Sequence, residues 1–186
     1  MTAARATMLR EQFDLTWALA EHHMAPLTDE DLLWAPTALH WTVRQRDDGG
    51  WHPDWDLTED GVEPDPVPVP TAGWVSWHLG WWWSTTLDHL QGRTPRDREE
   101  VLWPGSAEAT VAWLRGLRDR WTRLLDGLDD TALDAPAPFP WPAGSGRTVA
   151  DTLAWANAEL MKNVAELGQL RMLRAASQSG APHPPA

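Results

Sequence analysis

The stretch from Trp74 to Leu90, WVSWHLGWWWSTTLDHL, limits the fold more than any other, because it places five of the chain's 15 tryptophans in one segment. At the 100° spacing of an α-helix, Trp74, His78, Trp81 and Trp82 share one broad face. A threonine that can cap a helix precedes the stretch, and a glycine that can end one follows it. The sequence therefore predicts a helix over about 72–91 with an indole-rich face.

His78 has two interpretations in this setting. A histidine among indoles is commonly a buried side chain that a neighbouring polar group satisfies. The alternative is a metal ligand or proton-transfer group at the floor of an apolar pocket. The helix alone favours the first interpretation, so the rest of the chain has to decide.

The length of 186 residues suits a single domain, which we expect to cover 1–176 and to be followed by a disordered tail at 177–186. The net charge of −12, with lysine and arginine scattered, argues against nucleic acid and anionic membranes as partners. No apolar run is long enough to span a membrane, and the first residues lack the apolar segment of a signal peptide. We therefore expect a cytoplasmic protein.

The absence of cysteine removes disulfides, thiolate zinc sites and thiol nucleophiles at once. Any metal must be held by histidine, carboxylate or amide oxygen. Tyrosine is also absent, so no phenol can act as an acid, a base or a hydroxyl donor.

Three further long helices are predicted from apolar residues at helical spacing, over about 3–24, 106–126 and 148–175. Short acidic segments near 28–33 and 128–133 follow the first and third of the four helices. Threonine or aspartate side chains at the starts of these segments can accept hydrogen bonds from unpaired helix amides. Short helical turns are expected there.

The segment 34–70 cannot be a helix, because proline interrupts it repeatedly. It can hold at most a short hairpin between Leu39 and Trp55, with a turn at 47–50. A connection this long is commonly a functional lid or a mobile excursion. Its indoles favour an ordered cover over the end of the helices nearest His78, with one of them near that histidine; they are Trp34, Trp41, Trp51 and Trp55.

The two halves of the chain repeat one pattern of long helix, short acidic turn, proline-rich loop and threonine-capped long helix. Helices with one apolar stripe each are not stable alone in water. The pattern therefore predicts an all-α protein, a four-helix bundle with long first and third connections and a Trp/Pro-rich loop between the first two helices.

The 148–175 helix carries a polar line beside its apolar stripe, in which Glu159 and Asn163 lie one turn apart. This line is either a solvent-facing flank with an ordinary Lys162–Glu166 ion pair or part of a site. In a site, both groups would meet His78, and the set would suit Zn²⁺ or another first-row divalent ion.

Four motifs resemble the DinB/YfiT-like superfamily and, within it, the actinobacterial DinB-family proteins: TAGWVSWHLGWWWSTTLDHLQG, WPGS, FPW and AWANAELMKNVAELGQLR. The resemblance covers nearly the whole chain. It implies an up-down-down-up four-helix bundle, a homodimer and a divalent metal site at one end. It also implies a relation to S-transferases and isomerases that use low-molecular-weight thiols such as bacillithiol or mycothiol.

Carried over residue by residue, the resemblance assigns the metal ligands to His78, Glu159 and Asn163. Asn163 stands where a histidine is expected, so the binding of zinc or nickel should be weak. Alternative ligands are Glu166, His40 and His52. Without metal, we expect a direct Glu159–His78 contact that raises the pKa of His78.

Two functions follow. The first is a metal-dependent small-molecule enzyme, with a thiol-dependent S-transferase as its specific form. The second is a non-catalytic protein of this fold, with a degraded metal site, that binds a small ligand or a partner protein. In either case, the small molecule would contact Trp74, Trp81, Trp82 and Trp155.

Overall fold

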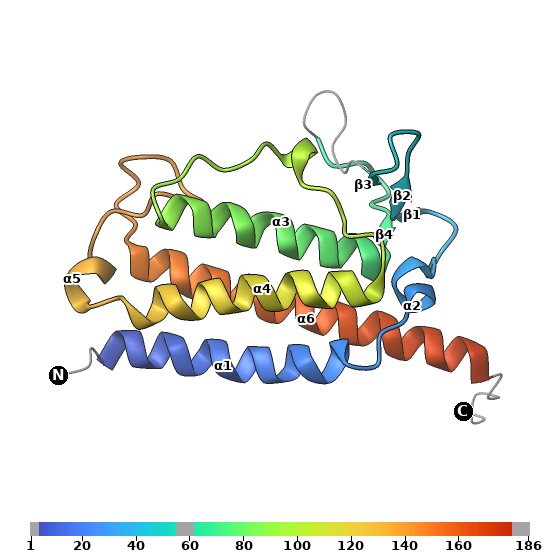
Figure 1. Ribbon diagram of the computed structural model, residues 1–186, viewed down its shortest axis with the longest axis horizontal. Helices are drawn as coiled ribbons and strands as arrows, with labels where there is room; N and C mark the ends of the chain where they lie inside the picture. The colour runs from blue at the N-terminus through green and yellow to red at the C-terminus, as the bar shows by residue number, and fades with distance from the viewer. Residues whose placement is uncertain (1–3, 55–61, 180–186) are drawn as a thin grey trace.

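The computed structural model describes residues 4–54 and 62–179, and most of them are helical (Figure 1). The largely helical class that the sequence predicts is therefore confirmed. The helices are α1 (Ala4–Met24), α2 (Asp29–Leu33), α3 (Ala72–Leu90), α4 (Ala107–Asp126), α5 (Asp130–Leu133) and α6 (Val149–Ser179), with a 3₁₀ turn η1 at Arg98–Glu100.

The four long helices lie side by side, with α1 and α6 running in one direction and α3 and α4 in the other (Figure 1). Helix α6 packs against both α1 and α3, and α4 packs against α3. Residues 177–179, where the tail was expected to begin, belong to the last turn of α6, whereas 180–186 lie outside the described residues. Among the described helices, none combines the length and the apolar character that crossing a membrane requires.

The core between these helices is built around aromatic rings. Phe13 of α1 lies 6.0 Å from Trp83 of α3 and 6.4 Å from Trp121 of α4, measured between ring centroids. All three side chains are almost fully buried. Such pairs add roughly 0.5–1.5 kcal/mol each beyond the burial of apolar area.

Gly80 sets how closely α3 approaches α4. A Cβ atom at this position would lie 2.0 Å from the indole of Trp113, so no other residue fits unless that indole or the helices move. The contact places the ring of Trp113 directly on the backbone of α3.

The connection between α2 and α3 contains four short strands: β1 (His40–Trp41), β2 (Val43–Gln45), β3 (Trp51–Pro53) and β4 (Val69–Pro70). The antiparallel pair β2–β3 is the predicted hairpin, and its turn contains Gly49 at a φ of 78°. The parallel pair β1–β4 was not predicted. Its two partners lie at opposite ends of the connection, so no local pattern indicates that they meet.

Side-chain caps fix where the helices begin. Thr71 accepts a hydrogen bond from the amide of Trp74 at the start of α3. At the start of α6, Thr148 and Asp151 hydrogen-bond each other's backbone amides at 3.4 and 2.8 Å. These reciprocal bonds satisfy amides that have no partner within the helix. Both threonine caps are those that the sequence predicts.

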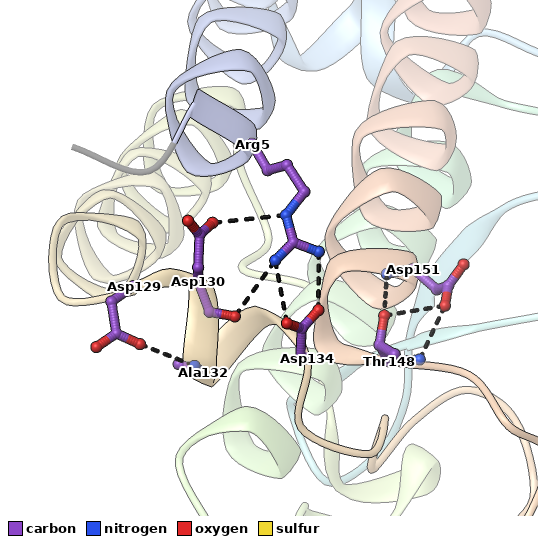
Figure 2. A network of polar contacts seen from close by, with 7 residues as sticks. All are labelled: Arg5, Asp129, Asp130, Ala132, Asp134, Thr148 and Asp151. Carbon is purple, nitrogen blue, oxygen red and sulfur yellow. Dashed lines mark hydrogen bonds and ion pairs between the residues drawn. The ribbon is translucent and has the colours of Figure 1, made fainter. Parts of the chain in front are cut away.

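The two acidic turns lie at opposite ends of the molecule (Figure 1). Figure 2 shows the α5 end, where Arg5 from α1 reaches Asp134 at 2.8 Å and Asp130 at 3.5 Å. At the α2 end, Arg174 from α6 pairs with Asp31 and with Glu30. Each turn is therefore tied by an arginine to a helix distant in sequence.

Candidate functional site

His78 lies in the first half of α3 within a row of stacked rings. Its imidazole is parallel to the indole of Trp74, at 5.1 Å and 8°, and tilted against that of Trp81 at 5.7 Å. The indole of Trp41 stacks on Trp74 at 5.2 Å, so the ring of Trp74 lies between Trp41 and His78. The described part of the Trp-rich connection thus lies at the His78 end, and Trp55 falls outside the described residues.

Indole N–H groups fasten the surrounding segments to α3. Trp74 donates to the carbonyl of Asp54 at 2.9 Å, and Trp77 donates to the carbonyl of Val101. Trp74 and Trp82 are only 7% and 4% exposed, so little of either ring is open to a ligand. Of the four predicted ligand-contacting tryptophans, the half-buried pair remains available for that role, namely Trp81 and Trp155.

Asn163 of α6 meets His78 across the helix pair. Its carboxamide oxygen accepts from the indole N–H of Trp82 at 3.0 Å, and its NH₂ group donates to a carboxylate oxygen of Glu166 at 2.9 Å. The same side chain lies close enough to His78 to affect the pKa of the imidazole. Asn163 is 1% exposed, so these contacts are made away from solvent.

Glu159 does not join this group. Its carboxylate lies 3.6 Å from the ammonium of Lys162, and its side chain is 28% exposed. Among the described residues it makes no ion pair with His78, so the expected direct contact is not formed. The expected Lys162–Glu166 pair is also replaced, because Lys162 turns to Glu159 while Glu166 accepts from Asn163.

The pKa of His78 is lowered from 6.5 to about 4. Burial is the main cause, and the positive charges of Lys162 and Arg98 add to it, while the polar side chain of Asn163 partly offsets them. The expectation of a raised pKa was wrong, because none of the described carboxylates acts on the imidazole. The imidazole is therefore neutral at pH 7.

The three predicted metal ligands do not fit a divalent cation as they are arranged. The amide of Asn163 is hydrogen-bonded to Trp82 and Glu166, and Glu159 is paired with Lys162 at 3.6 Å. Over residues 4–54 and 62–179, no three histidine or acidic side chains form a group that could hold a metal. The cations beside His78 would oppose a further positive charge.

The alternative ligands are also engaged elsewhere. Nδ1 of His40 lies 3.0 Å from the carbonyl of Thr37, in its own loop. Nε2 of His52 lies 2.9 Å from a carboxylate oxygen of Asp48, within the β2–β3 hairpin. Both histidines stabilise the loop that carries them rather than completing a site around His78.

A cavity of about 260 Å³ adjoins the ring cluster, and its walls come from the hairpin, α3 and η1. Arg98 joins the two features, because its guanidinium lies 5.7 Å from the ring centre of Trp81 and its charge lowers the pKa of His78. The sequence did not point to this cavity, since Arg98 lies in an unpatterned loop. Its lining residues are Arg46, His52, Pro53, Trp77, Arg98 and Glu99.

Comparison with known proteins adds the family. The family model described as DinB superfamily matches residues 12–167, which is most of the chain. Searches of the curated proteins and of the solved structures found no match.

Proposed function

This chain belongs to the DinB superfamily, and we propose that it binds a small organic anion beside His78 without a resident divalent metal. The observation that carries the proposal is that the polar groups around His78 are already paired with protein partners. Asn163 is bonded to Trp82 and Glu166, and Glu159 is bonded to Lys162. What they leave is a neutral imidazole stacked among indoles. His78 does not itself line the Arg98 cavity, and the link between them runs through Trp81, which contacts both His78 and Arg98.

The charges around the site support an anionic ligand. The charged groups that act on His78 are Lys162 and Arg98, both cationic. Arg98 and Arg46 also line the cavity, and among its described lining residues the one carboxylate is that of Glu99, which lies 3.9 Å from Arg98. The protein as a whole has a net charge of −12, whereas this cavity has two arginines in its wall. These arginines would attract a carboxylate.

His78 serves here as a hydrogen-bonding group rather than as a base. Protonating a side chain whose pKa is about 4 costs about 4 kcal/mol at pH 7. A general base is more effective with a pKa near the working pH. The imidazole can therefore orient a ligand next to Trp81 without changing its charge.

The first test is titration calorimetry with zinc, using chelator-treated protein without a histidine tag. The wild-type protein should bind zinc no more tightly than His78→Ala does. Asn163→His restores the imidazole that the family resemblance expects, so it should bind zinc much more tightly than the wild type. Zinc binding by the wild type that is lost in His78→Ala would overturn the metal-free proposal.

The second test titrates the protein with benzoate and with benzamide, its neutral counterpart of similar shape. Benzoate should bind, and benzamide should bind at least tenfold more weakly. Arg98→Gln and Arg46→Gln should each weaken the binding of benzoate. Arg123→Gln should not, because Arg123 is an exposed arginine elsewhere, on α4. Equal binding of benzoate and benzamide would contradict an anion site.

A metal-dependent thiol S-transferase is the second candidate. One observation favours it: a neutral, partly exposed His78 is in the protonation state that metal ligation requires. The zinc titration separates the two candidates, because only this one needs tight, His78-dependent binding. The homodimer and the cytoplasmic location stay predictions.

A further inference from the structure

A second cavity, of about 180 Å³, lies where α6 passes β4, and it shares no lining residue with the Arg98 cavity. Its walls are mostly apolar. Two of its apolar residues, Val69 and Leu173, are 40% and 48% exposed. The lining residues are Pro36, Val69, Pro70, Glu166, Gln169, Leu170 and Leu173.

Glu166 is the charged residue of this lining, and its carboxylate is held in place. One oxygen accepts from the NH₂ group of Asn163 at 2.9 Å, and Asn163 is itself fixed by the indole of Trp82. Throughout the described residues, no lysine, arginine or histidine forms an ion pair with Glu166. Lys162, one turn earlier on α6, pairs with Glu159 instead. Within the part of the chain that the structure describes, the second oxygen of Glu166 therefore has no partner.

A carboxylate beside an apolar wall, without a counter-charge, favours a cationic ligand with an apolar body. The net charge of −12 adds a field that attracts cations. The size also sets a limit, since an apolar cavity of about 150 Å³ accommodates benzene. The cavity at Glu166 is slightly larger than that.

We propose that this cavity binds small primary amines with an apolar body about the size of a benzene ring. The ammonium donates to the unpartnered oxygen of Glu166 and to the side-chain oxygen of Gln169. The body covers Val69, Leu170 and Leu173, which removes exposed apolar area from water. This site is separate from the anion site and goes beyond the function proposed above.

The probe is benzylamine, which is protonated at pH 7, and its neutral counterpart is benzyl alcohol. In titration calorimetry, benzylamine should bind at least tenfold more tightly than benzyl alcohol. Glu166→Gln should reduce the affinity for benzylamine to the affinity that the wild type has for benzyl alcohol. Glu11→Gln makes the same change of net charge at an exposed site on α1 and should leave the affinity unchanged.

A second variant tests the position of the cavity without changing charge. Leu173→Trp places a larger side chain at the rim of the cavity. It should weaken the binding of both benzylamine and benzyl alcohol while the far-UV circular dichroism stays unchanged. Equal affinities of Glu166→Gln and the wild type for benzylamine would overturn the proposal, as would equal binding of amine and alcohol. Benzoate binding should be the same in Leu173→Trp as in the wild type, because Leu173 lines only the second cavity, so failure of either site is distinguishable from failure of the other.

Discussion

The acidic turns α2 and α5 have similar sequences but different surroundings. Each starts at a side-chain cap, Thr28 or Asp129, and each receives an arginine from a helix distant in sequence. Arg174, at α2, is 10% exposed, and the Asp31 carboxylate that it meets is 15% exposed. Arg5, at α5, is 47% exposed and its partners lie in solvent (Figure 2).

The difference shows where the molecule depends on a precise polar contact. Turn α2 packs against α3, where a Cβ atom on Gly73 would lie 2.9 Å from the carbonyl of Leu32. This turn and the candidate site therefore rest on the same end of α3. A buried pair is costly to break from one side, whereas an exposed pair contributes little. The α2 end should be the sensitive one.

The largest effect is expected for Asp31→Ala. The variant removes the carboxylate that accepts from the backbone amide and hydroxyl of Thr28, and it leaves Arg174 without its more buried partner. We expect a loss of about 3 kcal/mol in the free energy of unfolding, measured by urea denaturation followed by far-UV circular dichroism. Asp134→Ala, which removes the partner of Arg5, is the matched control and should stay close to the wild type.

The contact between Asp31 and Arg174 should also make the stability of the protein depend on pH in the acid range. Although burial alone would raise the pKa of Asp31, hydrogen bonds from Thr28 and the charge of Arg174 lower it below 3.8. The folded state therefore binds this proton less readily than the unfolded state does. The stabilisation is complete above about pH 4 and is lost as the pH falls through the folded-state pKa. The loss of stability between pH 4 and pH 2 should be shallower in Asp31→Asn than in the wild type.

Arg174→Ala should cause the next largest loss of stability after Asp31→Ala, because Asp31 keeps its hydrogen bonds to Thr28 when the arginine is removed. Its midpoint of thermal unfolding should fall well below that of Arg5→Ala. Arg174→Lys should recover only part of the loss, since one ammonium cannot match a guanidinium that meets Glu30 and Asp31 together. Equal midpoints for Arg174→Ala and Arg5→Ala would remove the contrast between the turns.

The caps should behave alike at the two ends. Thr28 accepts from the amide of Asp31, and Asp129 accepts from that of Ala132 at 2.8 Å. Alanine at either position should cost about 1 kcal/mol in the free energy of unfolding. A much larger cost for Thr28→Ala than for Asp129→Ala would show that the whole α2 turn is sensitive, and not only the arginine contact.

The smallest effect is expected for Arg5→Ala. Its contacts with Asp134 and Asp130 are exposed and can be replaced by water. Its unfolding midpoint in urea should equal that of the wild type within error, and any difference at low ionic strength should vanish in 0.5 M salt. A clear loss that persists in salt would mean that the α5 end is as dependent on its arginine as the α2 end.

The helices could be predicted from the sequence because their limits are local. Thr71 and Thr148 are caps that act on residues three positions ahead, and proline closes the segments between helices. The parallel pair β1–β4 could not be predicted, because its contacts join distant residues through the backbone. The three residues that extend α6 into the expected tail carry no signal that distinguishes a last helical turn from a coil.

The site could be predicted only in part. The family resemblance assigns His78 and Asn163 to one site, and the structure brings them together. Glu159 was misplaced because spacing shows that a side chain shares a helix face, not which neighbour holds it, and Lys162 lies within reach. Neither cavity was predicted, since each is walled by side chains from segments far apart in the sequence.

The stacked indoles have an optical consequence. Trp41 and Trp74 are stacked at 5.2 Å, and Trp77 and Trp81 are stacked at 5.8 Å with their planes 6° apart. Transition dipoles this close share excitation, so each pair acts as one coupled chromophore with its own signature in the near ultraviolet. The first pair joins β1 to α3, so its coupling reads out the placement of the Trp-rich connection directly. Excitation should also migrate among the neighbouring rings Trp74, Trp77 and Trp81, so the emission of the intact protein should not belong to any one of them.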